Sequence, residues 1–442
     1  MQRGIHMFSF KAGNETKQYI KDGIRYVCEN YKRRSPGSQS ERDAQDYFKS
    51  ELEKYADEVL SEDFKLHPHA FMGFIIIAVS FCLISIALYW LFPSYIYAGS
   101  GKAEFILAAV PPVLSLLSIL MFLFEFLFYA EFVDFLFPKR VSKNVFATRK
   151  PTGEVKRRII FGGHADASYE WTFSLHGQLK TLLPIMAGSI IGMFFIFGST
   201  LARLIFSFKL GFVPEIATPA WKVCGIIMLV FIPFLICMYF FINWKVVVDG
   251  ANDNLSACYV AMGVLKEMAD NDFRFKNTEV CCLLTGSEEA GLRGAKAFAK
   301  KHQEEFKEVE TVAITLDTMR EIEQMQIYTQ GCTGTVKDSE AVGDLLFDAG
   351  KNNGLEMKRA ALYPGAVDAE GFSKYKIRAC GFCGVNHDPK TYYHTRKDTW
   401  DNIDENCINL SLDICLEAAK LYDEKGGISS YEKKRAKNKG RG

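Results

Sequence analysis

Hydrophobic residues fall into two different patterns along the 442-residue chain. In the first pattern, uncharged apolar stretches run on far longer than a buried strand needs. Each stretch holds about twenty residues, enough for a helix to cross the roughly 30 Å hydrocarbon layer of a bilayer. They are Phe71–Phe92, Phe105–Phe124, Leu182–Leu201 and Val223–Ile242. We predict four transmembrane helices; helices buried in a large soluble core are the alternative.

The four stretches come in pairs, which predicts two transmembrane helical hairpins, at 70–137 and 181–244. The rest of the chain then lies on one side of the membrane. Lys and Arg are more frequent beside the hairpin ends that lead into this part than in the loops, which favours a cytoplasmic position. The twelve Cys, several of them in apolar runs, agree with a reducing compartment. The N-terminus shows no signal-peptide pattern.

Outside the hairpins, the second pattern alternates short strand-like runs with amphipathic helices. One of these helices, within Arg34–Tyr55, begins with Ser38 and Glu41 at the spacing of a capping box. The alternation predicts an α/β fold with a mixed, largely parallel sheet flanked by helices. The segments of this predicted domain are 1–69, 138–180 and 245–428.

Three local patterns make further predictions. The turn Pro151–Lys156 predicts a hairpin between the strands on either side of it. The basic, Gly-containing end, 429–442, predicts a disordered tail. Cys380 and Cys383 form a CxxC pair inside a strand-like run, where we favour core packing over a metal or redox site. The net charge of +1 indicates no nucleic-acid partner.

Residues with metal-binding side chains follow the strand-like runs. Parallel strands bring their carboxyl ends to one edge of a sheet, where α/β proteins bind ligands. Imidazole and carboxylate groups both bind zinc well. The residues at these strand ends are His164, Asp253, Glu288, Glu289, Asp317 and His394. Each has an ordinary alternative as a turn, cap or surface residue, but together they predict a site for a pair of zinc-like ions.

The two adjacent glutamates lie in the segment CCLLTGSEEAGLRG, Cys281–Gly294. A buried strand that ends at Thr285 and an N-cap at Ser287 would put Glu288 and Glu289 in the first turn of a helix. Carboxylates in a first turn stabilise a helix through its dipole. Stabilisation of a helix start is therefore the alternative to a chemical role for this pair.

Five segments, in chain order, resemble the co-catalytic di-zinc aminopeptidases of metallopeptidase family 28. They are GGHADA, GANDNLSA, LLTGSEEAGLRGA, ITLDTM and YYHTRKDTWDNID. The likeness covers residues 20–69, 140–170 and 246–424, and it implies the zinc exopeptidase fold with the two hairpins inserted. Leu255–Ala257 departs from the Ala-Ser-Gly that usually follows Asp-Asn in the family, but this difference removes no ligand.

The resemblance also implies a role for each residue at the strand ends. The ligands of two Zn²⁺ ions would be His164 and Asp317 for one, Glu289 and His394 for the other, and Asp253 for both. Glu288 would be the general base, and Asp166 would orient a ligand histidine. Tyr363 is a candidate for assisting the reaction, with a surface aromatic residue as the alternative.

We therefore expect a membrane-bound zinc metallopeptidase that releases N-terminal residues from peptides with a water activated by two zinc ions. A carboxypeptidase or dipeptidase with the same metals is one alternative. A glutaminyl cyclase, which is a single-zinc acyltransferase on a related fold, is another. The third is a non-catalytic membrane receptor on a peptidase fold, against which the complete ligand set and Glu288 both weigh.

Overall fold

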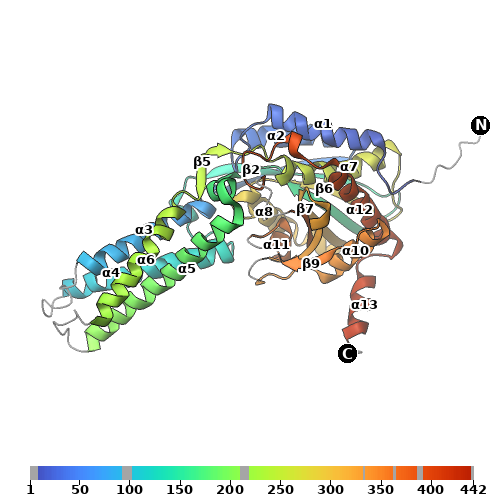
Figure 1. Ribbon diagram of the computed structural model, residues 1–442. Helices are drawn as coiled ribbons and strands as arrows, with labels where there is room; N and C mark the ends of the chain where they lie inside the picture. Colours follow the sequence, from blue (N-terminus) through green and yellow to red (C-terminus); the bar gives the residue numbers. More distant parts are fainter. Residues whose placement is uncertain are drawn as a thin grey trace, which may run out of the picture. The chain divides into compact units, whose positions relative to one another are not determined.

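The computed structural model describes residues 8–91, 102–209, 219–331, 334–361, 365–385 and 392–439. The chain forms two compact units (Figure 1). We call them the α/β unit and the helical unit. The α/β unit comprises Met1–Pro68, Lys139–Glu170 and Trp244–Gly442, and the helical unit comprises His69–Pro138 and Trp171–Asn243.

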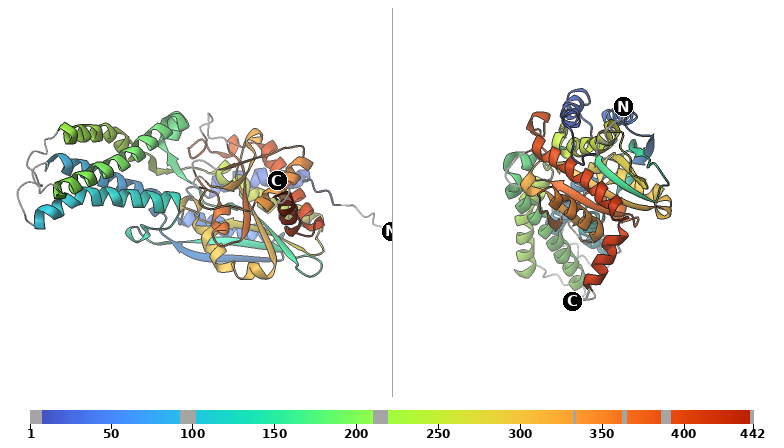
Figure 2. Two further views of the ribbon diagram at one scale, coloured as in Figure 1. Left: turned by 90° about the horizontal axis from the view of Figure 1, so that it is seen from below. Right: turned by 90° about the vertical axis from the view of Figure 1, so that its right-hand side faces the viewer.

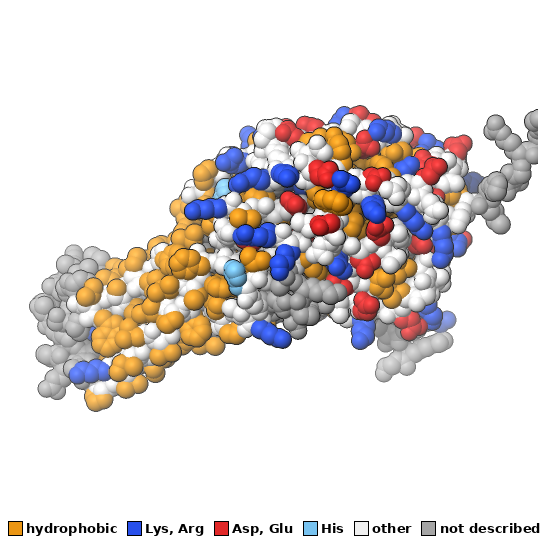
Figure 3. Space-filling model, turned by 45° about the horizontal axis from the view of Figure 1, so that its top comes forward, with side chains coloured by type: hydrophobic (Ala, Val, Ile, Leu, Met, Phe, Trp, Pro, Cys, Tyr) orange, Lys and Arg blue, Asp and Glu red, His pale blue; other side chains and the backbone are white. Residues whose placement is uncertain are grey.

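The helical unit is built from long apolar helices. They are α3 (Ala70–Leu91), α4 (Lys102–Met121), α5 (Thr172–Lys209) and α6 (Pro219–Met238). Among the described residues, four helices are long and apolar enough to cross a membrane. Hydrophobic side chains dominate the surface of this unit in Figure 3, whereas both signs of charge cover the α/β unit. The second insertion begins at Trp171, earlier than the boundary at 181 that the sequence predicts.

The α/β unit contains a mixed sheet, which confirms the predicted fold class. Within the described residues it has eight strands, in the order β1-β2-β6-β3-β7-β10-β8-β9. The neighbours β6, β3, β7 and β10 run parallel to one another. The strands are β1 (Glu58–Leu66), β2 (Arg140–Arg149), β3 (Arg157–His164), β6 (Thr278–Thr285), β7 (Glu310–Met319), β8 (Gln326–Gln330), β9 (Lys358–Ala361) and β10 (Arg378–Gly384).

Helices cover both faces of this sheet (Figures 1 and 2). On one face lie α1 (Asn14–Asn30), α2 (Gln39–Leu52), α7 (Ser256–Asp270), α10 (Glu340–Asn352) and α12 (Glu405–Glu424). On the other face lie α8 (Arg293–His302), α9 (Glu305–Glu308) and α11 (Asp368–Ser373). Because the strands in the middle of the sheet are buried on both sides, their apolar residues face both sides rather than alternating with exposed polar residues.

Strand β6 shows how one apolar run supplies two cores. Cys282 and Leu284 pack with α7 and α12 on one face, whereas Cys281 and Leu283 pack with α8 and α11 on the other. The CxxC pair of β10 divides in the same way, with its two thiols on opposite faces of the sheet. This arrangement confirms core packing as the role of that pair.

The hairpin predicted at Pro151–Lys156 is wrong. Strand β6 lies between β2 and β3, antiparallel to the first and parallel to the second. Thr152 and Gly153 instead donate backbone hydrogen bonds to Phe275 and Lys276, just before β6. The turn thus crosses the end of a third strand, which local turn signals cannot reveal.

The disorder predicted for 429–442 is also wrong where the structure describes this segment. Ser429–Lys439 form the helix α13. Tyr431 is buried in the main core, and Arg435 forms ion pairs with Asp344 and Glu340 of α10. The buried aromatic ring and the ion pairs of Arg435 outweigh the high net charge of the helix.

Removing the aromatic anchor tests whether α13 is docked. We expect Tyr431→Ala to lower the free energy of unfolding of the purified full chain by about 3 kcal/mol, the typical cost of truncating a buried aromatic side chain. The matched control is Lys433→Ala in the same helix, which should change it by less than about 0.5 kcal/mol because Lys433 is exposed. Equal effects of the two substitutions in a denaturant titration would contradict the docking.

Candidate active site

The predicted site residues converge at the carboxyl edge of the parallel strands. His164 ends β3, and Asp317 lies near the carboxyl end of β7. Asp253 precedes α7, where the side chain of Asn254 donates to the carbonyl of Leu316 and accepts from the N–H of Thr318. These two hydrogen bonds hold the chain before α7 against the end of β7.

His394 comes from the loop before α12, which an ion pair between the exposed Arg396 and the buried Glu170 holds in place. The side chain of Arg396 donates two hydrogen bonds to Glu170, and the backbone N–H of Arg396 donates a third. The side chain of Glu170 is 1 % exposed. The ring of Tyr393 stacks on the imidazole of His394 with 4.1 Å between centroids. The loop therefore presents its histidine in a fixed orientation.

Asp253 is the centre of the cluster, because its two carboxylate oxygens face different histidines. Oδ1 lies 3.1 Å from Nε2 of His164, and Oδ2 lies 2.9 Å from Nε2 of His394. Asp317 lies 3.9 Å from His164, and Glu289 lies 3.0 Å from His394. Two groups of three possible metal ligands result, and they share Asp253.

The cluster is buried and carries more acidic than basic groups. The exposed fractions of its side chains range from 2 % for His164 to 16 % for Asp317. Burial, and then Asp253, raise the pKa of Asp317 to about 7. Burial would lower the pKa of His394, but Glu289 and Asp253 raise it to about 10. The site therefore favours any positive charge that enters it.

The turn that carries the two glutamates differs from the one that the sequence predicts. Ser287 has φ 55°, in the left-handed region, and its side chain caps no helix. Glu288–Ala290 form a single 3₁₀ turn, and α8 begins only at Arg293. The N-cap prediction is therefore wrong, because the Ser287 hydroxyl donates a hydrogen bond to Glu41 of α2 and caps no helix.

The carboxylate of Asp166 accepts hydrogen bonds from this turn and also lies beside His164. Its Oδ1 accepts the N–H of Glu288 and its Oδ2 the N–H of Glu289, both at 3.0 Å. The same Oδ1 lies 3.4 Å from Nδ1 of His164. One fully buried carboxylate thus connects the ends of β3 and β6.

Part of the chain matches a known protein family. Residues 240–419 match the model of peptidase family M28. This part of the chain is therefore similar to that family. No curated protein matches the chain by sequence.

Solved structures share the fold of this chain. An aminopeptidase from Aneurinibacillus sp. strain AM-1 is 14% identical, with a TM-score of 0.51 over 92% of this chain and 93% of that one. BSAP, a zinc aminopeptidase from Bacillus subtilis, is 12% identical, with a TM-score of 0.51 over 95% and 96%. The glutaminyl cyclase of Fimbriiglobus ruber is 11% identical, with a TM-score of 0.53 over 93% and 97%.

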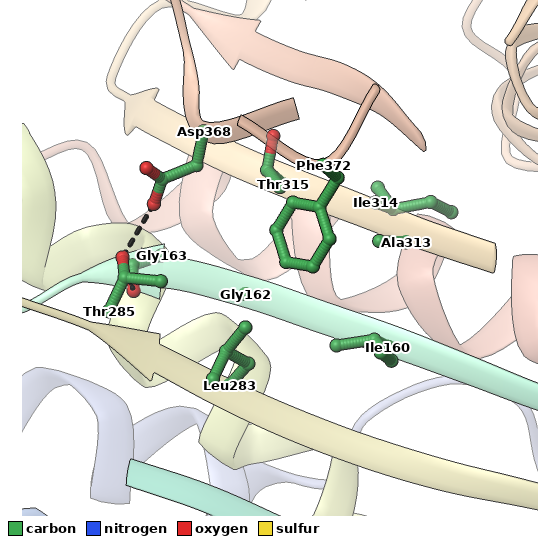
Figure 4. Close-up of a pocket in the computed structure, with 10 residues that line it drawn as sticks. All are labelled: Ile160, Gly162, Gly163, Leu283, Thr285, Ala313, Ile314, Thr315, Asp368 and Phe372. Atoms are coloured by element: carbon green, nitrogen blue, oxygen red, sulfur yellow. Dashed lines mark hydrogen bonds between the residues drawn. The ribbon is translucent and has the colours of Figure 1, made fainter. Parts of the chain in front are cut away.

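Two further buried carboxylates lie beside the cluster, and no sequence pattern predicts a role for either of them. Asp398 accepts hydrogen bonds from the backbone and side chain of Asn252 and from the N–H of Asp253. Asp368, at the start of α11, accepts the hydroxyl of Thr285 at 2.5 Å (Figure 4). Burial raises the pKa of Asp398 to about 7 and that of Asp368 to about 6.

The space beside Asp368 is packing rather than a ligand site. It lies between β3, β6, β7 and α11, and the ring of Phe372 fills one side of it (Figure 4). It is too tight to hold a water molecule. The remaining residue predicted to assist the reaction, Tyr363, lies outside the described residues.

Arg34 joins two of the loops that carry site residues. It is fully buried, and its guanidinium donates to the carbonyls of Ala165, Asp249 and Tyr31 at 3.1, 2.6 and 3.1 Å. Ala165 follows His164 directly in the chain. A planar fork of donors is needed to bind three carbonyls at once, which explains an arginine at this position.

Conservative replacement tests the role of this fork. We expect Arg34→Lys to lower the free energy of unfolding by about 2 kcal/mol, since an ammonium group cannot reach the three carbonyls together and leaves buried acceptors unpaired. The matched control is Arg25→Lys, because Arg25 is exposed and its contacts, an ion pair with Glu29 and a cation–π contact with the ring of Trp400, can also be made by a lysine; we expect a change below about 0.5 kcal/mol. Chemical denaturation measures both, and a tolerated lysine at 34 would contradict the assignment.

Proposed function

We propose that this protein is a membrane-bound zinc metallopeptidase that releases N-terminal residues from peptides. The observation that carries the proposal is Asp253, whose two oxygens face two separate histidines. This is the arrangement that a carboxylate bridging two metal ions requires. The four apolar helices support attachment to a membrane, and the charge bias of the sequence supports a cytoplasmic α/β unit.

The donor set fits two zinc ions. Ligand atoms around one tetrahedral Zn²⁺ are roughly 3.3–3.6 Å apart, since each bond is about 2.0–2.2 Å long. The nitrogen–oxygen distances in the cluster, from 2.9 to 3.9 Å, lie around this range. The excess of buried acidic groups also calls for added positive charge. His164 and Asp317 would hold one ion, Glu289 and His394 the other, and Asp253 both.

Glu288 has the position of a general base. Its Oε2 lies 3.8 Å from Nε2 of His164, inside the cluster, yet it belongs to neither group of three possible ligands. Burial, and then the carboxylates around it, raise its pKa well above the usual value, and a proton acceptor near neutral pH needs such a rise.

The reaction would divide between the ions and the side chains. Bound zinc lowers the pKa of a water molecule towards 7 and polarises a carbonyl oxygen. Glu288 would accept a proton from the attacking water and return it to the leaving amine. Asp166 would keep Glu288 in place through the backbone, and Arg396 with Glu170 would keep His394 in place.

A glutaminyl cyclase remains the second candidate, because the glutaminyl cyclase of Fimbriiglobus ruber shares the fold. That activity needs a single zinc ion. The presence of two complete groups of ligands supports the peptidase over the cyclase. Carboxypeptidase or dipeptidase activity uses the same metals and differs in which peptide end is recognised.

Metal content distinguishes the first two candidates. We expect the purified protein to bind two zinc ions per chain, to lose peptidase activity on dialysis against a chelator, and to regain it with Zn²⁺. His394→Ala should reduce the content to one ion, because it removes a ligand of only one group. Elemental analysis measures both proteins, and a wild type that saturates at one ion would favour the cyclase.

Replacing the proposed base separates chemistry from metal binding. We expect Glu288→Gln to lower kcat by a factor of about 10²–10⁴, the usual contribution of general base catalysis, with the zinc content unchanged. Peptides with free and with blocked N-termini serve as substrates, and cleavage of the free ones alone identifies an aminopeptidase. Unchanged turnover in the variant would rule out this mechanism.

A further inference from the structure

The turn before Glu288 depends on support from outside itself. Ser287 has a left-handed backbone, φ 55° and ψ 42°, although it is not a glycine. An L-residue in this region is strained, so tertiary contacts must hold it there. Leu292 at φ 59° shows that the backbone stays irregular up to the start of α8.

Glu41 of α2 supplies this support from more than two hundred residues away in the chain. Its Oε1 accepts the N–H of Ser287 at 2.7 Å and the hydroxyl of the same residue at 2.9 Å. Its Oε2 accepts the N–H of Gly37 at 2.8 Å, and this N–H also points to the Ser287 hydroxyl at 3.1 Å. The side chain of Glu41 is completely buried.

Two buried carboxylates therefore accept hydrogen bonds from three consecutive backbone N–H groups. Glu41 accepts that of Ser287, and Asp166 accepts those of Glu288 and Glu289. Hydrogen bonds from N–H groups to buried carboxylates are among the strong ones in proteins. With all three N–H groups fixed, the backbone that carries both functional glutamates has one orientation relative to the sheet edge.

We infer that Glu41 is a positioning residue for the site, acting through Ser287 on the base Glu288 and on the metal ligand Glu289. The inference rests on the proposed function for the roles of those two glutamates. Glu41 lies outside residues 240–419, the segment that matches the family model, and its contribution follows from the hydrogen bonds of this chain alone.

Another glutamate of the same unit provides a matched comparison. Glu267 is 6% exposed, and it too accepts the N–H of a loop glycine, Gly13, at 3.1 Å. It bonds to no residue of the turn. Replacing it by glutamine therefore reproduces the general cost of altering a buried carboxylate without touching the site.

The test compares Glu41→Gln with Glu267→Gln in the full-length protein. Glutamine keeps the shape but puts an amide donor against one of the N–H groups that Glu41 accepts. Titration of the metal-free protein with Zn²⁺ against a chromogenic chelator should show one site weakened about 10–100-fold in Glu41→Gln, as is usual for partners that orient ligands. At saturating zinc, kcat should fall by a similar factor while KM stays within about threefold. Glu267→Gln should change neither quantity.

A second, milder variant keeps the inference testable if Glu41→Gln fails to fold. Ser287→Ala removes the hydroxyl but keeps the N–H, and we expect a several-fold loss in the same two quantities. Where both variants fold, their combination should lose less than the product of the single effects, since both act through one contact.

The possible outcomes separate this inference from the proposed function. If wild type binds zinc and cleaves peptides, and Glu41→Gln and Ser287→Ala match Glu267→Gln in zinc affinity and kcat, Glu41 is no positioning residue. If wild type binds zinc without cleaving peptides, the proposed function fails, and the zinc titration alone decides on Glu41. A wild type that binds no zinc overturns both.

Discussion

The burial of many carboxylates at one sheet edge is the constraint on which the rest of the site depends. A buried carboxylate is stable only when hydrogen bonds or positive charge compensate for lost water. Glu41, Asp166 and Asp398 obtain this compensation from backbone N–H groups. A second set, formed by Asp253, Asp317, Glu288 and Glu289, instead gathers around two histidines. The first set fixes the backbone, and the second is left with the negative charge that a pair of cations would balance.

The sequence allowed the parallel strands and the residues at their ends to be predicted, because both follow from local patterns. A run such as β6 is apolar on both faces, and a polar residue just after it marks the carboxyl edge. The left-handed backbone of Ser287 could not be predicted, since a serine before two glutamates has a strong local preference for the N-cap position of a helix. The partner that overrides this preference, Glu41, is 246 residues away. The spacing of Ser38 and Glu41 indicated a helix start, but not that the carboxylate would serve another turn.

The insertions enter the α/β unit at places where the chain leaves and returns side by side. Leu66, at the end of β1, is directly paired with Arg140, at the start of β2. The second insertion begins within β4 (Tyr169–Trp171) and ends within β5 (Ile242–Val247), and these two strands pair with each other. Paired ends already fix the separation that an inserted segment must span, so a pair of helices adds no strain to the sheet. The parallel strands that carry the site are not interrupted.

The family match alone does not contain a complete site. Residues 240–419 include Asp253, Glu289 and His394, but β3 and its histidine lie before them, as does the whole of α2. Asp166 and Glu41 therefore reach into the matched segment from parts of the chain that the first and second insertions separate from it. Because the N–H groups of one turn are divided between these two residues, the orientation of the paired glutamates is set only when all three segments of the α/β unit have come together. The cluster is therefore complete only in the folded α/β unit, and a fragment limited to the matched residues would lack His164, a proposed ligand, and both carboxylates that hold the turn of Glu288.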